Sequence, residues 1–374
     1  MVRLGVFGVA GIAVVLVLAG AGWLLSLPPA PEFVVAQPIA PAETEHVVAA
    51  LKASKRTRPL VAIVGMNDAT ETTDYLMPYG ILKRADVADV MLIATQAAPV
   101  TLFPALKVEP QASIASFDEQ HPDGADYVIV PAMSRDDDPA VLAWIKAQAA
   151  KGAIMIGVCA GAKVVASAGL LDGKRATTHW YYLDELRKRH PSIRYVPDRR
   201  IIVDGKVVTT TGITASMPLS LTLIEAIAGH DKAQAVANEL GLAAWDARHA
   251  SDAFKFTRPF AWTAIRNAVV FWNHETLGLA LDRGVDEVAL ALAADAWSRT
   301  YRSRAVTFAN DVQETKNGLR IVPDAAAPNW PAGRHLPNIT GKPVEALDAA
   351  LDGIAARYGK STAAFVAMQL EYPR

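Results

Sequence analysis

The sequence has one cysteine, Cys159, in 374 residues, and it has almost no net charge. A single thiol excludes an internal disulfide as well as cysteine-rich zinc and iron–sulfur sites. Lysine plus arginine (37) nearly balances aspartate plus glutamate (38), so no overall field attracts nucleic acid or acidic lipid. Hydrophobic residues make up 52% of the chain, which is enough for a large core. Function must therefore be sought in local sites.

Several common motifs are also missing. The histidines show no paired metal-ligand spacing such as H-x-x-x-H, and no glycine-rich phosphate loop follows the first apolar run. Residues 246–374 lack a helix-turn-helix pattern and a basic face, and prolines interrupt the stretch where recognition helices would stand. We therefore expect no metal, no cofactor and no nucleic-acid partner.

The first residues predict a membrane anchor. Residues 5–27 carry no charge, and this length is sufficient for a helix to cross the ~30 Å hydrocarbon layer. Arg3 precedes the run and acidic residues follow it, which places the amino terminus in the cytoplasm and the body outside. A cleaved signal peptide is the alternative, because Ala19-Gly20-Ala21 has the small-x-small pattern of a cleavage site. Clustered prolines in residues 28–57 then predict a semi-rigid linker.

Between residues 58 and 245, short apolar runs alternate with helical segments. The expected strands are Leu60–Val64, Asp89–Ala94, Tyr127–Val130, Ala153–Val158, Ile201–Val203 and Val207–Thr211, and the expected helices include Thr72–Arg84, Asp138–Lys151 and Pro218–Ala228. This alternation predicts an α/β fold, with a parallel sheet sandwiched by helices.

Residues 246–374 are predicted to form a C-terminal α/β extension. Ala268–Phe271, Val285–Tyr301 and Ala305–Phe308 repeat the strand, helix, strand order found at the start of the first domain. A degenerate half-repeat that pads or extends the sheet explains this order, and an unrelated α/β decoration explains it equally well.

The strongest local signal surrounds the cysteine. Gly157-Val158-Cys159-Ala160-Gly161 follows an apolar strand and precedes a helix-like segment, which is the G-x-nucleophile-x-G form of a strand-to-helix elbow. Glycines on both sides allow a sharp turn, and the helix start favours thiolate over thiol. A reactive thiol of lowered pKa is therefore expected at Cys159, the alternative being a small buried cysteine packed behind a helix.

Two blocks, GVCAGAKVVASAGLLDGKRATTHW and VDGKVVTTTGITASMPLSLTLIEAIAG, resemble the ThiJ/PfpI family within the class I glutamine amidotransferase-like superfamily. The similarity is greatest to the amidase-like sensory domain of GlxA-like, AraC-type regulators. It covers residues 58–245 and implies a flavodoxin-like fold, a reactive cysteine, a small-molecule substrate or ligand and frequent homodimers. The family places an acid that hydrogen-bonds the cysteine four residues before a proline, which gives Asp74, with Glu71 as the nearest rival. His179 occupies the position of a family histidine.

The resemblance also implies backbone amides that stabilise an oxyanion. These are Ala160 on the elbow and, in the loop after residues 127–130, Ala132 and Met133. Relatives carry Pro-Gly-Gly where this chain has Pro131-Ala132-Met133, and this departure weakens the expectation of a second donor. Ala160 stands where the peptidase-like branch has a histidine, and TTTGITASMP lacks the histidine of glutaminases, so both activities are disfavoured.

Two functions remain. The first is a cysteine-dependent hydrolase, hydratase or lyase that acts on a small electrophile through Cys159, Asp74 and His179. The second is a non-catalytic module that senses a ligand or the redox state. A membrane-tethered scaffold is a weaker third possibility.

Overall fold

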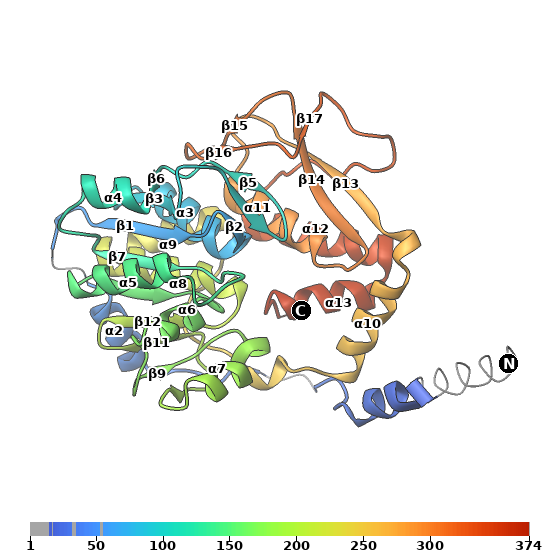
Figure 1. The fold of residues 1–374 in the computed structure, drawn as a ribbon, viewed down its shortest axis with the longest axis horizontal. Helices are drawn as coiled ribbons and strands as arrows, with labels where there is room; N and C mark the ends of the chain where they lie inside the picture. The colour runs from blue at the N-terminus through green and yellow to red at the C-terminus, as the bar shows by residue number, and fades with distance from the viewer. Residues whose placement is uncertain (1–14, 17, 32–34, 53–54, 374) are drawn as a thin grey trace, which may run out of the picture.

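A computed structural model describes residues 15–16, 18–31, 35–52 and 55–373. Its centre is a seven-stranded sheet in the order β11-β12-β8-β7-β1-β3-β6 (Figure 1). The strands are β1 (Leu60–Gly65), β3 (Asp89–Ala94), β6 (Ala112–Ser113), β7 (Tyr127–Val130), β8 (Ile154–Gly157), β11 (Ile201–Asp204) and β12 (Val207–Thr210). Neighbouring strands run parallel except for the antiparallel pair β11–β12. The predicted α/β class and the parallel sheet are confirmed.

Both faces of this sheet are buried, and side chains alternate between them. Val61 and Ile63 belong to one hydrophobic cluster, whereas Leu60, Ala62 and Val64 belong to the other. Successive residues of a strand point to opposite faces, so a strand covered on both sides is apolar throughout. This explains why the strand signals in the sequence are continuous rather than alternating.

Helices cover the two faces. The first face carries α2 (Pro41–Ala50), α3 (Thr72–Ala85), α8 (Ser216–Ala228) and α9 (His230–Leu240), and the second carries α4 (Ile114–Gln120), α5 (Pro139–Ala150), α6 (Gly161–Ser167) and α7 (Leu183–Arg189). Helix α2 lies within the predicted linker, where Pro41 starts the helix and Val47 is buried in the core. A two-stranded sheet pairs β9 (Arg175–Ala176) with β10 (Arg194–Tyr195).

The prediction of a membrane-spanning helix over residues 5–27 requires correction. Residues 5–14 and 17 of that stretch lie outside the described part, and residues 15, 16 and 18–26 are helical. Spanning a bilayer takes about 20 consecutive apolar residues. Among the residues that the structure describes, no helix combines the length and the apolar character needed to cross a membrane. A single-pass membrane protein with an extracytoplasmic body is therefore not supported.

The C-terminal part forms two small sheets. A parallel sheet has the order β13-β14-β17, and a five-stranded sheet β15-β16-β5-β4-β2 combines strands from both parts of the chain. The bounds are β2 (Asp68–Glu71), β4 (Val100–Phe103), β5 (Lys107–Val108), β13 (Glu275–Ala280), β14 (Ser303–Ala309), β15 (Gln313–Glu314), β16 (Arg320–Ile321) and β17 (Ala325–Ala326). The strand expected at 268–271 is wrong, because the helix α10 (Arg258–Val269) covers its first half.

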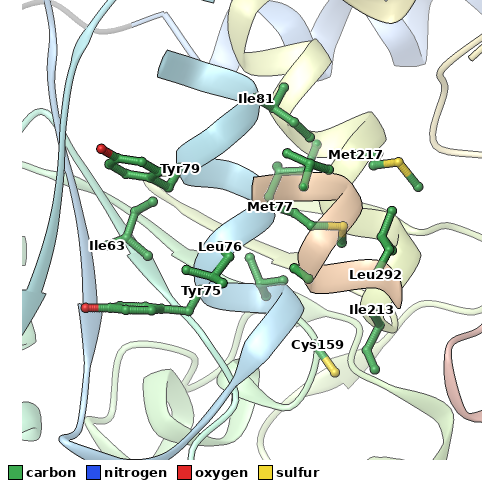
Figure 2. Close-up of a cluster of buried hydrophobic side chains, with 14 of the residues drawn as sticks. Ile63, Tyr75, Leu76, Met77, Tyr79, Ile81, Cys159, Ile213, Met217 and Leu292 are labelled. Carbon is green, nitrogen blue, oxygen red and sulfur yellow. The ribbon is translucent and has the colours of Figure 1, made fainter. Parts of the chain in front are cut away.

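Helix α11 (Glu287–Ser298) joins the C-terminal part to the first domain by packing on α3. Met77 of α3, Met217 of α8 and Leu292 of α11 lie in one cluster of buried side chains that also includes Cys159 (Figure 2). Helix α12 (Pro343–Tyr358) packs on α11, and α13 (Lys360–Gln369) packs on α12 and α10. The two parts of the chain thus share a hydrophobic core.

Because this core is shared, we expect Leu292→Ala to destabilise the whole chain. The side chain is fully buried, and truncating a buried leucine to alanine costs about 2–5 kcal/mol. Urea denaturation followed by circular dichroism should show a lower free energy of unfolding in one transition. Trp262→Ala is the control, since that side chain is 52% exposed. A separate early transition of the C-terminal part would contradict the shared core.

Candidate active site

Cys159 stands on the sharp turn between β8 and α6. Its φ angle is 56°, in the left-handed region, which costs a non-glycine residue roughly 1–2 kcal/mol. Gly161 has no such angle, but a Cβ there would lie 1.9 Å from the carbonyl oxygen of Val130. The elbow predicted from the sequence is present. Its backbone strain falls on Cys159, and Gly161 is needed because the start of α6 approaches the end of β7 too closely for a side chain.

Two threonines hold the backbone of the elbow. The amide of Cys159 donates to Thr210 Oγ1 at 3.1 Å, and Thr178 Oγ1 donates to the carbonyl of Cys159 at 3.0 Å. Thr210 ends β12, the strand beside β8, and Thr178 follows β9. Hydrogen bonds to both sides of the residue compensate for the strain of its backbone.

The thiol is buried, with 3% of Cys159 exposed. Burial raises the pKa of Cys159 well above its ordinary value, and the carboxyl groups of Asp74, Glu71 and Glu371 raise it further. The Ala160 amide and the Arg299 guanidinium act in the opposite direction without outweighing this increase. The expectation of a lowered thiol pKa is therefore wrong for this structure. Helix α6 is short, and its amides do not outweigh desolvation.

Asp74 lies on the first turn of α3 and is completely buried. Its Oδ2 accepts a hydrogen bond from the amide of Ala132 at 3.1 Å, whereas Oδ1 has no partner among the described residues. Burial raises the pKa of Asp74 to about 8, and the interaction with the Cys159 side chain moderates this increase. Asp74 is thus neutral at pH 7 and can donate a hydrogen bond through its carboxyl group.

Glu71, the rival acid, has a different task. It caps α3 by accepting from the amide of Asp74 at 2.7 Å, and its Oε1 accepts from Arg299 Nη2 at 2.6 Å. Arg299 also donates from Nε to Asp295 Oδ1 at 2.5 Å. Burial and the neighbouring carboxyl groups raise the pKa of Glu71, and the Arg299 guanidinium opposes this increase. Thr73 Oγ1 also donates to Glu71 Oε2 at 2.8 Å, so this carboxylate, with three partners, orients the start of the helix on which Asp74 stands.

The charges in this cluster do not cancel. Glu71, Asp74 and Asp295 are buried carboxyl groups, and Arg299 is the guanidinium that pairs with two of them. Full ionisation would leave two uncompensated negative charges in a region of low dielectric, which is far more costly than binding a proton. Asp74 is the carboxyl group without a direct cation contact, and burial together with the charge of Asp295 favours its protonated form.

His179 lies near the elbow, but both of its ring nitrogens already form hydrogen bonds. Its Nδ1 accepts from the amide of Tyr181 at 3.1 Å, so Nε2 carries the hydrogen and donates to the carbonyl of Gln369 at 2.9 Å. Burial lowers the pKa of His179, which keeps the imidazole neutral. Both ring nitrogens contact backbone, and among the described residues no hydrogen bond joins His179 to Cys159.

The end of the chain closes over this region. Glu371 is buried and accepts from the amides of Trp180 at 3.0 Å and Gly212 at 2.8 Å, while its carbonyl accepts from Thr214 Oγ1 at 2.9 Å. Burial acts to raise the pKa of Glu371, but His179, His249 and the two amides reverse this and lower it. A carboxylate supplied by the C-terminal tail therefore faces the cysteine site.

The amides predicted to form an oxyanion hole are arranged unequally. The amide of Ala160 lies close enough to the thiol to lower its pKa. The amide of Ala132 is used by Asp74, and Met133 forms an isolated bridge with Thr70. The elbow amide is thus directed at the sulfur, whereas the second predicted donor supports the acid.

Sequence reasoning missed five residues of this site: Thr178, Thr210, Asp295, Arg299 and Glu371. The threonines follow strands beside the elbow, so their position at strand ends was a usable signal. The other three lie in the C-terminal part, and no local pattern marks them.

Comparisons with known proteins find related sequences and folds. A model of the DJ-1/PfpI family matches residues 60–226. The chain is 35% identical over 172 residues to isonitrile hydratase from Pseudomonas putida, a match that covers 45% of this chain and 72% of that enzyme. It is 36% identical over 104 residues to the HTH-type transcriptional regulator CdhR from Pseudomonas aeruginosa, covering 28% of this chain and 31% of the regulator. The crystal structure of Drosophila melanogaster DJ-1beta is 22% identical, matches 50% of this chain and 100% of its own, and has a TM-score of 0.45.

The raised pKa of Asp74 predicts a dependence of stability on pH. The folded protein retains a proton up to about pH 8, whereas the unfolded carboxyl group loses it near its ordinary value of 3.8. Stability from this group is therefore complete at low pH and decreases between these values, by about 1.4 kcal/mol per pH unit. Asp74→Asn should remove this contribution, as measured by urea denaturation from pH 5 to 8.

Asp86→Asn is the matched control for that measurement. Asp86 caps the other end of α3, is exposed, and has a pKa lowered by its hydrogen bond to Arg58. Its replacement should leave the slope of stability between pH 5 and 8 unchanged. Equal slopes in the wild type and Asp74→Asn would show that Asp74 is ionised in the folded state.

Proposed function

The chain belongs to the DJ-1/PfpI family, and from this premise we propose that it is a cysteine-dependent enzyme that hydrates or hydrolyses small electrophilic molecules. The observation that carries the proposal is the pairing of a buried thiol with a neutral carboxyl group. Asp74 is neutral at pH 7, and its Oδ1 has no other partner among the described residues. A nucleophile beside a proton donor is suited to substrates that must gain a bond to sulfur and a proton together.

Isonitriles fit this requirement, and the similarity to isonitrile hydratase supports them as the first substrate class to test. The terminal carbon of an isonitrile is both electrophilic and basic. Cys159 Sγ forms a bond to this carbon while Asp74 delivers its proton to the same carbon and takes up the thiol proton. The product is a thioimidate, in which the carbon–nitrogen triple bond has become a double bond.

Water completes the reaction. Water adds across the carbon–nitrogen double bond, with its hydroxyl on carbon and one proton on nitrogen. The carbon–sulfur bond then breaks as the hydroxyl proton passes to Asp74 and the proton held by Asp74 passes to the sulfur. The net reaction adds one water to R–N≡C and yields the formamide R–NH–CHO. The amide of Ala160, which already lies beside the sulfur, supports the charge that develops at the reacting centre.

The raised thiol pKa is compatible with this sequence. A permanent thiolate is not required when the proton leaves sulfur as the carbon is protonated. Burial keeps the thiol and the carboxyl group away from bulk solvent, which limits loss of the proton before the bond to carbon forms. Rates should therefore follow the protonated fraction of Asp74 rather than a pre-formed thiolate.

We expect purified protein to convert alkyl isonitriles to formamides, monitored by loss of the isonitrile infrared band and by mass spectrometry. Cys159→Ser should abolish turnover because no thioimidate forms. Asp74→Asn should lower kcat by roughly 10²–10⁴, the usual contribution of a general acid, because an amide cannot supply the proton. Activity should decline above about pH 8 as Asp74 ionises.

Asp86→Asn again serves as the control on α3 and should retain wild-type turnover. Full activity of Cys159→Ser would exclude the cysteine as the nucleophile. An Asp74→Asn variant with wild-type kcat would exclude the proposed proton transfer even if the cysteine is essential.

A ligand-binding module without turnover is the second candidate, and the burial of Cys159 favours it. The amide of Ala132, which would be the second oxyanion donor, is occupied by Asp74. In that case isonitriles, amides and 2-oxoaldehydes would remain unconverted, while a bound molecule would slow alkylation of Cys159.

A further inference from the structure

The C-terminal part repeats the start of the first domain element by element. The order β1-α3-β3-β4-β5-β6 recurs as β13-α11-β14-β15-β16-β17, with β2 as an additional strand in the first of the two. We call residues 60–113 the first unit and residues 275–326 the second unit. In each unit the two long strands pair in parallel over six residues, and the second of them pairs in parallel with the last short strand.

The short hairpins of the two units match residue by residue. In the first unit Val100 pairs with Val108, and in the second Gln313 pairs with Ile321. The neighbouring pair in the first unit, Thr101 with Lys107, corresponds in the same way to Glu314 with Arg320. An unrelated decoration would not be expected to reproduce the same register.

The two units meet at equivalent residues. Val108 pairs with Ile321 across the antiparallel junction of β5 and β16. The amide of Glu109 donates to the carbonyl of Arg320 at 3.0 Å, and the amide of Val322 donates to the carbonyl of Lys107 at 2.8 Å. Each bond is the counterpart of the other with the units exchanged. Reciprocal contacts of this kind are the signature of a two-fold interface between identical subunits.

The two helices show the same reciprocity. Glu71 is the N-cap of α3 and pairs with Arg299, which ends α11. Asp286 is the N-cap of α11 and pairs with Arg84 in the last turn of α3. Each arginine thus pairs with the capping carboxylate of the opposite helix, so an internal two-fold axis passes between α3 and α11.

We infer that the second unit takes the place of a second subunit across this internal axis, and that it supplies Arg299 as a positioning residue for the Asp74–Cys159 pair. The inference deepens the proposed function and rests on it. Arg299 holds Glu71, Glu71 accepts from the amide of Asp74, and the carboxyl group of Asp74 is thereby fixed beside the thiol. The Cys159 site is incomplete without the C-terminal part.

Only one of the two symmetry-related positions carries chemistry. Asp74 lies three residues after the N-cap of α3, and Ala289 occupies the same position after the N-cap of α11. The second unit contains no cysteine and no elbow. The counterpart pair, Arg84 with Asp286, therefore stabilises the same helix interface without facing a thiol.

This asymmetry provides a matched experiment. The titratable groups that face the thiol are Asp74, Glu71, Tyr182, Glu371 and Arg299. Removing the cation of Arg299 leaves the surrounding carboxyl groups uncompensated and makes the thiolate harder to form. Removing Arg84 breaks an equivalent ion pair at the opposite end of α3.

The measurement is the rate of Cys159 modification by methyl methanethiosulfonate against pH in the full-length protein, read by mass spectrometry. Arg299→Gln should shift the midpoint upward by about one pH unit, which is about tenfold slower labelling below the midpoint. Arg299→Lys should restore most of the wild-type profile, because the positive charge is kept. Arg84→Gln should leave the profile unchanged, and circular dichroism establishes that each variant is folded.

An equal shift in Arg84→Gln would reduce Arg299 to a structural role and overturn the inference. An unshifted profile in folded Arg299→Gln would do the same. Labelling needs no turnover, so the profile reports on Arg299 whether or not isonitriles are hydrated.

A disulfide cross-link tests whether the second unit of the same chain occupies the place of a second subunit. Val108 and Ile321 face each other between the two reciprocal hydrogen-bonded positions, an antiparallel geometry that brings the Cα atoms to about 4.5 Å. Val108→Cys with Ile321→Cys, in a Cys159→Ser background, should form a disulfide within one chain. Non-reducing electrophoresis should show a single-chain species, whereas a disulfide-linked dimer would show that the second unit belongs to another copy.

Discussion

The buried excess of carboxyl groups beside Cys159 is the constraint on which the rest of the site depends. Glu71, Asp74 and Asp295 are buried together, and one guanidinium, that of Arg299, pairs with Glu71 and Asp295. Electrostatic cost in a buried region is relieved by retaining a proton, and the acid without a cation contact retains it. The neutral state of Asp74 thus follows first from burial, and the neighbouring charge of Asp295 adds to it. The same burial raises the thiol pKa, so acid and nucleophile are tuned together.

That charge balance requires the C-terminal part of the chain. Arg299 and Asp295 belong to the end of α11, and Glu371 to the tail that follows α13. Each reaches the site because α11 packs on α3 and the tail lies against the Trp180 and Gly212 amides. Cys159 belongs to the hydrophobic cluster that also contains Leu292 of α11 and Phe365 of α13. Its burial, and hence its chemistry, is a property of the assembled chain.

Sequence reasoning recovered the parts of the fold that local patterns encode. The strands of the central sheet, the elbow and the choice of Asp74 as an acid near the cysteine followed from apolar runs, glycine spacing and family resemblance. The thiol pKa was misjudged because burial by residues more than a hundred positions away carries no local signal. The hydrogen bond of His179 to the Gln369 carbonyl was missed for the same reason, because Gln369 is also distant in the sequence. The membrane helix was inferred from the length, apolar character and flanking charges of residues 5–27, but among the described residues no helix combines the length and apolar character needed to cross a membrane.

Because the second unit belongs to the same chain as Cys159, the site does not depend on association with another protein molecule. When a second subunit completes a pocket, occupancy of the complete form depends on protein concentration. An internal two-fold removes that dependence, because the second unit is always present at the interface. The two units also need not both carry catalytic residues. Ala289 can therefore stand in the second unit at the position equivalent to Asp74, and the site that contains Asp74 is unaffected. The second unit is then free to diverge everywhere except at the contacts that hold α3, the β5–β16 junction and Glu71 in place.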